Sequence, residues 1–299
     1  MKGDKLLIVD FYALLHRSRN ALLRATGGLS TSDGRPTTGA YGFVNNLLST
    51  IEKIKPSHVV VCYDAGSNWR KEVSSEYKAN RTGPEDGDSF RQEALDALDD
   101  LLPALGIPVI GVKGYEADDA IYTLSRNATD FDDIVIFTCD QDLLQCVSEK
   151  TRVLLFNSAK KVTSMGLDEV RESWGVNPPH VALVKALSGD SSDNIKGVRG
   201  IGQKTATKIV VESYAILDTI LKHPKIEPFK DRVISNLELI RPTYVGELQD
   251  VNYSDFVLGG STLGHVREAF ERYEFSALLK RLRKIGETLK MKTESQTAS

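Results

Sequence analysis

Short acidic clusters recur in this sequence, each after a run of apolar residues. They end the segments KLLIVD and VVVCYD and stand within GYEADD, FTCDQD and SGDSSDN. The acidic residues are Asp10, Asp64, Glu116, Asp118, Asp119, Asp140, Asp142, Asp190 and Asp193. Carboxylates gathered in a partly buried cleft repel one another and raise each other's pKa values unless cations neutralise them. Because oxygen-only ligands favour Mg²⁺ or Mn²⁺ over zinc, the pattern predicts a divalent metal site.

Each cluster also has a purely structural interpretation. A single Asp after a strand is a common turn former or helix N-cap, which would suffice for Asp10 or Asp64 taken alone. GYEADD opens a predicted helix, where acidic residues suit the helix dipole. DQD could be a turn between strand and helix, and SGDSSDN a capped loop. A structural role for one cluster would be ordinary, but five acidic clusters at the ends of successive elements are less expected by chance. Their repetition favours a shared site.

The apolar runs predict the elements that would bring these acids together. Strands are expected at residues 5–10, 58–64, 107–112, 133–138 and 152–156, with helical segments between them. This alternation indicates an α/β fold with a mainly parallel sheet. Parallel strands end at one common edge, where open α/β sheets bind ligands. The acidic clusters should therefore meet along that edge.

The second half of the chain has a different pattern. After about Asn177 no comparable strand signal continues, and the sequence from about Glu287 is polar without periodicity, which predicts a disordered tail. Helices are expected at 178–188, 202–221, 228–240 and 262–284. The predicted domains are an α/β core over 1–177, a helical lobe over 178–286 and the tail over 287–299.

Composition sets the class of protein. With 299 residues, 41% hydrophobic and 26% charged, the chain can bury a large core. No apolar run reaches membrane-spanning length, and the segment MKGDKLLIVD lacks the features of a signal peptide, so a cytoplasmic location is expected. Cys62, Cys139 and Cys146 have no paired spacing and are expected to be reduced core residues.

The formal net charge of −3 argues at first against a polyanionic partner. Two bound divalent ions would add four charges and shift this balance to about +1. Basic residues also cluster, at 69–81, 196–208 and 280–284. Basic patches beside an acidic metal cleft suit a phosphodiester substrate. The alternative is that these patches are ordinary solvated faces.

The segment KGVRGIGQKTATK, residues 196–208, is named here the glycine-rich turn. Its glycines, Gly197, Gly200 and Gly202, precede a predicted helix. Glycine lets the backbone approach a ligand closely, and the amides of a helix N-terminus can bind a phosphate. The segment predicts binding to a nucleic-acid backbone without regard to sequence, and the alternative is an ordinary turn between helices.

Residues 66–90 combine Trp69 and Tyr77 with four basic residues and a tip rich in glycine and proline. Aromatic and basic residues interleaved in this way suit stacking on an exposed base while phosphates are held. The alternative is a surface loop whose aromatic side chains pack back on the sheet.

These motifs together resemble those of the 5′-nuclease (flap endonuclease) superfamily. The segments that carry the resemblance are VDFYALLHR, CYDAGSNWRKE, EYKANR, GYEADD, CDQDLLQ and LSGDSSDNIKGVRGIGQKTA. They are most similar to the group that contains the 5′–3′ exonuclease domain of bacterial DNA polymerase I and the stand-alone phage 5′-exonucleases, and they cover residues 5 to about 212. Phe11 and Cys139 depart from the small residue and the glycine that are usual there, but neither change removes a ligand.

The resemblance implies a PIN-like nuclease core, a helical arch over about residues 68–104 and a helix–three-turn–helix over about 188–212. It also implies two Mg²⁺ ions, replaceable by Mn²⁺. One ion would be held by Asp10, Asp64, Glu116 and Asp118, and the other by Asp118, Asp140, Asp142 and Asp193. Asp119 and Asp190 would act through water.

The remaining roles come from the same resemblance. Lys78, Arg81 and Lys185 would neutralise the scissile phosphate, and Tyr77 would stack on the neighbouring base. Further substrate contacts are implied for Arg70, Gly197, Arg199, Gly200, Gly202, Lys204 and Thr205, with a K⁺ ion at the turn. The expected partner of the monomer is DNA with 5′ ends, flaps or junctions, including RNA–DNA primers. Cleavage would leave a 5′-phosphate and a 3′-hydroxyl.

The sequence therefore predicts a structure-selective, Mg²⁺-dependent 5′-nuclease, and three other classes remain for comparison. A phosphatase of the haloacid dehalogenase kind would need a second Asp two residues after Asp10, where this chain has Tyr12. A PIN-type ribonuclease shares the carboxylates but would not need the helical lobe. In a nucleic-acid-binding scaffold the acids would be structural only.

Overall fold

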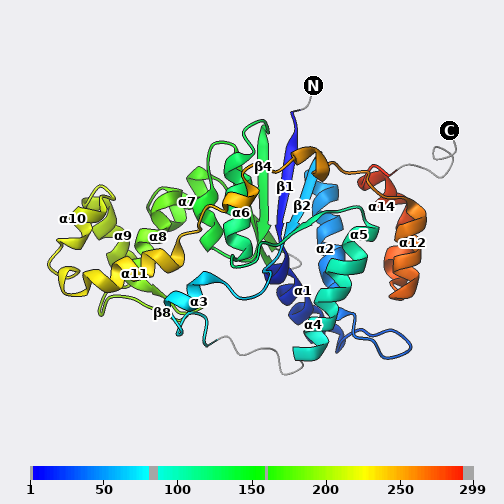
Figure 1. Cartoon of the computed structure of the whole chain (residues 1–299), viewed down its shortest axis with the longest axis horizontal. Helices are drawn as coiled ribbons and strands as arrows, with labels where there is room; N and C mark the ends of the chain where they lie inside the picture. Colours follow the sequence, from blue (N-terminus) through cyan, green and yellow to red (C-terminus); the bar gives the residue numbers. More distant parts are fainter. Residues whose placement is uncertain (1–2, 81–86, 159–160, 292–299) are drawn as a thin grey trace.

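A six-stranded sheet stands at the centre of the structure (Figure 1). The computed structural model describes residues 3–80, 87–158 and 161–291. The strand order is β3-β2-β1-β4-β5-β6, and all neighbours are parallel except β6, which runs antiparallel to β5. The strands are β1 (Lys5–Asp10), β2 (His58–Cys62), β3 (Val109–Ile110), β4 (Asp133–Thr138), β5 (Thr151–Ser158) and β6 (Lys161–Met165). The predicted mainly parallel α/β fold is confirmed.

The order of the strands creates a crevice at the carboxyl edge of the sheet. From β1 the chain adds β2 and β3 on one side, and then β4 and β5 on the other side of β1. The two halves wind in opposite directions from the β1–β4 pair, and such a switch point is where open α/β sheets bind ligands. Asp10 is the last residue of β1, and Asp140 follows two residues after the end of β4.

The inner strands are apolar throughout because both faces of the sheet are covered. Leu6 and Ile8 of β1 belong to one core, and Leu7 and Val9 to the other, and all four are fully buried. Successive side chains of a strand point to opposite faces, so a strand buried on both faces has a continuous apolar run without polar alternation.

One face of the sheet is covered by helices from the middle of the chain, which lie to the left in Figure 1. They are α6 (Ala117–Asn127), α7 (Leu167–Trp174), α8 (Val181–Ser188), α9 (Gln203–Glu212), α10 (Leu217–Leu221) and α11 (Lys230–Ile240). Between α8 and α9 lies a two-stranded hairpin of β7 (Gly189–Asp190) and β8 (Ile195–Lys196). Residues 202–221, expected as one helix, are interrupted by a turn in which Tyr214 and Ala215 have positive φ.

The opposite face is covered by helices from both ends of the chain. They are α1 (Phe11–Thr26), α2 (Thr38–Ile54), α4 (Gly87–Asp96), the π-helical turn η1 (Ala97–Leu101), α5 (Leu102–Ala104), α12 (Leu263–Arg272), α13 (Ser276–Leu279) and α14 (Leu282–Thr288). No helix in the described ranges is long and apolar enough to cross a bilayer.

The C-terminal helices do not join the expected helical lobe. Phe270 of α12 and Ile285 of α14 share a core with Leu47 of α2. In Figure 1, α12 and α14 lie at the opposite end of the molecule from α9, α10 and α11. The segment 178–286 is therefore divided between the two faces, because the apolar stripe of α12–α14 packs on α2 and α5.

The first residues of the predicted disordered tail are ordered. Glu287 and Thr288 belong to α14, and Leu289 is fully buried in the core beneath it. This apolar side chain holds the segment to the fold, and the rest of the predicted tail, 292–299, lies outside the described residues.

The expected arch, residues 68–104, is described at both of its ends. It begins with α3 (Trp69–Val73) and continues after residue 86 with α4, η1 and α5. Residues 81–86, and with them Arg81, lie outside the described residues. The α4 end is fixed to the core by Glu93, which is fully buried, accepts a hydrogen bond from Nε of Arg19 at 2.9 Å and accepts another from the amide of Ala40.

Removing Glu93 should destabilise the whole fold. Glu93→Ala leaves the buried guanidinium of Arg19 without its carboxylate, and breaking a buried pair costs about 3–5 kcal/mol of unfolding free energy. Urea unfolding followed by circular dichroism would measure this loss. Asp218→Ala removes an exposed partner of Lys222 and should change the free energy by less than about 0.5 kcal/mol. Similar losses in the two variants would contradict this assignment.

Candidate active site

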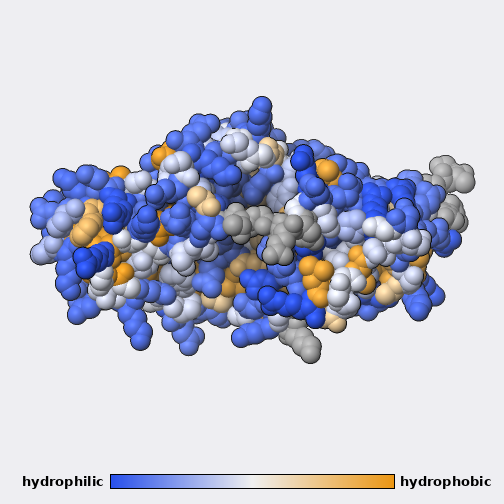
Figure 2. Space-filling view, turned by 90° about the horizontal axis from the view of Figure 1, so that it is seen from below, coloured by the Kyte–Doolittle hydropathy of each residue, from blue (hydrophilic) through white to orange (hydrophobic). Residues whose placement is uncertain are grey.

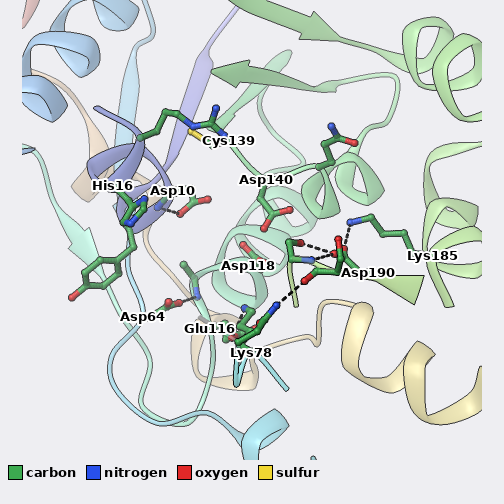
Figure 3. Close-up of a pocket in the computed structure, with 18 of the residues that line it drawn as sticks. Asp10, His16, Asp64, Lys78, Glu116, Asp118, Cys139, Asp140, Lys185 and Asp190 are labelled. Atoms are coloured by element: carbon green, nitrogen blue, oxygen red, sulfur yellow. Dashed lines mark hydrogen bonds and ion pairs between the residues drawn. The ribbon is translucent and has the colours of Figure 1, made fainter. Parts of the chain in front are cut away.

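A cavity of about 930 Å³ opens at the carboxyl edge of the sheet, where the strand order reverses. Of the nine predicted acidic ligands, six line it: Asp10, Asp64, Glu116, Asp118, Asp140 and Asp190. Lys78 and Lys185 line it as well. Figure 3 shows these carboxylates projecting from separate elements into one space, with the two ammonium groups at its side. We call this space the acid cavity.

Asp10 stands at the junction of β1 and α1. Its carboxylate caps α1 by accepting from the amide of Ala13, and its other oxygen accepts from the hydroxyl of Thr138 at 2.6 Å. Burial, against the opposing hydrogen bond from Thr138 and with the help of the charges of Asp140 and Asp64, raises the pKa of Asp10 to about 7. The carboxylate therefore resists ionisation unless a cation is near.

Two further acids lie beside or within the first turn of α6. Asp64, which follows β2, accepts a hydrogen bond from the amide of Ala117 at 2.7 Å, so the β2 edge is tied to this helix. Asp118 lies in the first turn of α6. Burial raises the pKa of Asp118 well above its usual value, and the nearby charges of Asp140 and Asp10 act in the same direction. The acids thus repel one another across the cavity.

Glu116 is surrounded by donors from residues 68–78. One of its carboxylate oxygens accepts from Nζ of Lys78 at 2.7 Å and from the amide group of Asn68, and the other accepts from the hydroxyl of Tyr77 at 3.0 Å. Tyr77 is only 4% exposed, and its hydroxyl also donates to Asp193. This burial does not support the expected stacking of Tyr77 on a base. The hydroxyl lies between the carboxylates of Glu116 and Asp193, and this position buries the aromatic ring.

Lys185 bridges the other side of the cavity. Its ammonium group contacts the carboxylate of Asp142 and donates to Asp190 at 2.7 Å. Burial and the neighbouring charge of Asp140 raise the pKa of Asp142 to about 7 in spite of the lysine. Burial also opposes ionisation of Asp190, but the ion pair with Lys185 and the bonds from Ser192 lower its pKa to about 2. Asp142 and Asp193 do not line the acid cavity itself.

Arg70 and Asp119 form a buried pair away from the cavity. The guanidinium of Arg70 donates to both oxygens of Asp119, at 2.7 and 2.8 Å, and to the carbonyls of Leu239 and Arg241. Arg70 is 2% exposed and Asp119 is fully buried. The expected substrate contact of Arg70 and the water-mediated metal role of Asp119 are therefore not supported. Both groups are saturated by contacts that join α3, α6 and the segment after α11.

The carboxylate oxygens that line the cavity are the type of ligand that divalent cations such as Mg²⁺ prefer. All six acids that line the cavity offer hard oxygen atoms, and the raised pKa values of Asp10 and Asp118 show that nearby positive charge would stabilise their ionised forms. In the described part of the chain no three acidic, histidine or cysteine side chains converge closely enough to hold one ion in this conformation. Instead, the ammonium groups of Lys78 and Lys185 occupy positions beside carboxylates. Ligation would require these carboxylates to turn from the lysines toward an ion.

Several residues that line the cavity were missed from the sequence. Ala13, His16 and Arg17 of α1 line it together with Asp10, and Phe90 of α4 lies opposite. The rings of His16 and Phe90 are 5.7 Å apart in an edge-to-face arrangement. The helical period could have identified the α1 residues, because positions three, six and seven after Asp10 fall on one helix face. Nothing local in the sequence could have predicted that Phe90 reaches the same place.

The cysteines have no disulfide partners, in agreement with the prediction of reduced residues. Cys62 and Cys146 are buried in the core, whereas Cys139 lines the acid cavity next to Asp140. Burial and the charge of Asp10 raise the pKa of the Cys139 thiol to about 12, so it stays protonated.

The glycine-rich turn lies outside the acid cavity except for Gln203, which lines it. Gly200 has φ of 80°, a conformation that glycine adopts without strain. Arg199, Gly200, Gly202 and Lys204 are exposed, and Thr205 is half-buried at the start of α9. Figure 2 looks onto the side of the molecule that lies at the bottom of Figure 1, and this face is hydrophilic over most of its area. The turn is thus placed on the surface with its cations facing solvent.

Two domain families match the chain. Residues 5–175 match the 5′-3′ exonuclease N-terminal resolvase-like domain, and residues 176–244 match the 5′-3′ exonuclease C-terminal SAM fold. The sequence is 39% identical over 230 residues to the 5′-3′ exonuclease of Bacillus subtilis, with 76% of each chain covered. It is also 34% identical over 295 residues to the DNA polymerase I of the same organism, covering 93% of this chain but only 32% of the polymerase.

The fold is also similar to that of a solved phage enzyme. The bacteriophage T5 flap endonuclease, in a pseudo-enzyme-product complex with DNA and metal ions, superposes with a TM-score of 0.63 at 22% sequence identity. The match covers 96% of this chain and all of the phage chain. At this level of identity the likeness shows a shared fold.

Stability without metal should fall as pH rises toward neutrality. The folded-state pKa values of Asp10 and Asp142 are about 7, above the unfolded value of 3.8, so the unfolded state ionises first as pH rises. In chelator, the melting temperature should therefore decrease between about pH 4 and about pH 7. Asp190 has the opposite sign, but its effect lies below that window because its pKa is lowered to about 2.

Mg²⁺ should reverse this trend, because it binds the ionised carboxylates and competes with protons. The gain in melting temperature on adding Mg²⁺ should be larger at about pH 8 than at about pH 5. Asp10→Asn removes one raised pKa and serves as the matched control, with a flatter pH profile in chelator and a smaller gain. An equal gain at the two pH values would contradict the site.

Proposed function

This chain belongs to the 5′-3′ exonuclease family, and from this premise we propose that it is a nuclease that hydrolyses DNA phosphodiester bonds near 5′ ends and at 5′ flaps. The relatives named DNA polymerase I are about three times longer, so only this part of their activity is considered. The observation that carries the proposal is the acid cavity at the topological switch point, with six carboxylates and two lysines around it.

Two Mg²⁺ ions, with Mn²⁺ as a substitute, would be held by the lining carboxylates and by neighbouring Asp142 and Asp193. Asp10, Asp64, Glu116 and Asp118 are proposed for one ion, and Asp118, Asp140, Asp142 and Asp193 for the other. When bound, such ions lower the pKa of water and stabilise the charge on both oxygens of an in-line displacement at phosphorus. Asp118 is proposed for both ions because the charges of both Asp140, assigned to one ion, and Asp10, assigned to the other, raise its pKa.

The chain's own cations would act on the phosphate. Nζ of Lys78 lies at the cavity wall 2.7 Å from Glu116, and Nζ of Lys185 lies 2.7 Å from Asp190. If these carboxylates held ions instead, the two ammonium groups would be available to the scissile phosphate. A preorganised cation at the site where charge develops lowers the barrier without reorganisation during the reaction. No protein nucleophile is needed, since water supplies the attacking oxygen.

The terminal bases need an aromatic surface if the phosphate is to reach the cavity, because stacked bases would hold it away. Tyr77 is buried, so we assign this role to Phe90 and His16, whose rings line the cavity. The glycine-rich turn would hold the duplex arm through its exposed amides, Arg199 and Lys204, with K⁺ between its carbonyls and a phosphate. The nuclease core, residues 1–177, would carry the chemistry, and the helical lobe, here 178–240, the duplex.

Further details follow from this scheme. The products would be a 5′-phosphate and a 3′-hydroxyl, and a 5′ RNA–DNA primer would be a substrate where the cavity tolerates ribose. We propose that the enzyme acts as a monomer in the cytoplasm.

Cleavage of a 5′-labelled flap on a duplex tests the function directly. The protein should cut it in Mg²⁺ and not in chelator, and Asp118→Asn should lower the rate by at least about a hundredfold, because it removes a ligand shared by both ions. Asp190→Asn should retain more activity. An RNA strand of the same sequence, cut in preference to the DNA flap, would favour the ribonuclease alternative. A fully active Asp118→Asn enzyme would contradict the proposal that Asp118 binds both ions.

Lys78→Ala separates chemistry from binding. Only contacts that strengthen in the transition state accelerate the chemical step, so the single-turnover rate should fall by about two orders of magnitude. The dissociation constant for the flap, measured in Ca²⁺, should rise by no more than about tenfold. Lys222→Ala, on an exposed pair of α10, is the control for loss of a surface cation. A normal cleavage rate in Lys78→Ala would remove this lysine from the mechanism.

A further inference from the structure

Lys78 is held in an uncommon backbone conformation. Its φ is 55°, in the left-handed region where a residue with a side chain is strained. This conformation lets its amide donate to the carbonyl of Asp193 at 2.9 Å while its side chain reaches Glu116. Such a conformation persists only where surrounding contacts fix it.

The fixing contacts come from the loop between β7 and β8. The amide group of Asn194 donates to the carbonyl of Glu76 at 2.7 Å, and that of Asn80 donates to the carbonyl of Ser191 at 2.8 Å. Asn194 itself has φ of 58°, which asparagine tolerates better than most residues. The two segments, 74–80 and 189–196, thus bond to each other on both sides of Lys78.

The same β7–β8 hairpin is fixed to the glycine-rich turn. A Cβ on Gly197 would lie 2.2 Å from the backbone of Ser188, so the end of α8 and the start of the turn approach so closely that only glycine fits. The buried amide group of Asn236, on α11, donates to the carbonyls of Ala186 and Lys196 at 2.9 and 3.0 Å. The hairpin therefore contacts both the turn and the segment that carries Lys78.

We propose that Asn80 and Asn194 are positioning residues that hold Lys78 in register with a duplex bound at the glycine-rich turn, and so favour 5′ ends attached to a duplex over free single strands. This rests on the proposed nuclease function. A duplex held at the turn fixes where its scissile phosphate lies, so Lys78 must be at a matching position. A free single strand is not anchored at the turn, and its phosphate can follow Lys78 if the lysine moves.

Single-turnover cleavage of two substrates tests this: a 5′ flap on a duplex, and the same strand alone. Asn194→Ala and Asn80→Ala should lower the ratio of the flap rate to the single-strand rate by at least about tenfold, since a displacement near 1 Å can cost a hundredfold. Asn194→Gly tolerates the left-handed backbone but lacks the amide group, and it should lose the preference as well. Flap affinity in Ca²⁺ should change by less than about threefold.

Glu76→Gln is the matched control. It keeps the carbonyl that Asn194 uses and removes only an exposed ion pair with Lys196, so it should keep the wild-type ratio. Asn80 is exposed, so its variant should fold even if an Asn194 variant does not. Equal losses on both substrates, or a wild-type preference in Asn194→Gly, would overturn this inference. If the wild-type protein cuts neither substrate in Mg²⁺, the proposed function fails instead.

Discussion

The repulsion among carboxylates at one edge of the sheet is the constraint on which the rest of the structure depends. Parallel strands deliver their carboxyl ends to a single edge, and here Asp10, Asp64 and Asp140 all follow strands whose order reverses at that point. Burial and mutual charge raise the pKa values of Asp10 and Asp118. A fold that gathers these groups must supply positive charge or hydrogen-bond donors to hold them.

Two kinds of contact meet this need, and they lie in different places. Facing the cavity, Lys78 and Lys185 pair with acids through long side chains that can turn away. Behind it, Arg70 pairs with Asp119 through two hydrogen bonds, and both groups are almost completely buried. Because a buried bidentate pair is costly to break, Arg70 fixes the start of α6, whereas the lysines remain adjustable. Acids from one motif, GYEADD, thus divide between the lining of the acid cavity and a buried structural pair.

Sequence reasoning located the site because strand ends can be read from apolar runs, and position along a parallel strand determines the edge. It assigned Asp119 a water-mediated metal role and did not predict its pair with Arg70, since that partner lies 49 residues away on α3. The three-residue spacing from Glu116 to Asp119 was the available signal, because it matches a capping box that turns the second acid inward. The apolar stripe of α12 likewise predicted a packed helix but could not say which face of the sheet it would cover. That choice depends on the shape of α2 and α5, which only the folded chain provides.

The burial of Tyr77 shows how the site keeps its negative charge. Its hydroxyl lies 3.0 Å from Glu116 and 3.2 Å from Asp193 and shares its one proton between them, and burial together with these acids raises the pKa of Tyr77, so it remains a neutral donor. A lysine there would have neutralised an acid, whereas a phenol holds two in place and leaves their charge. With every group ionised, the cavity lining carries six carboxylates against Arg17, Lys78 and Lys185, an excess of three negative charges. Two divalent ions would reverse that sign to one positive charge, which is the sign a phosphodiester requires. The cavity would therefore attract nucleic acid only once metal is bound, so ion binding would precede productive substrate binding.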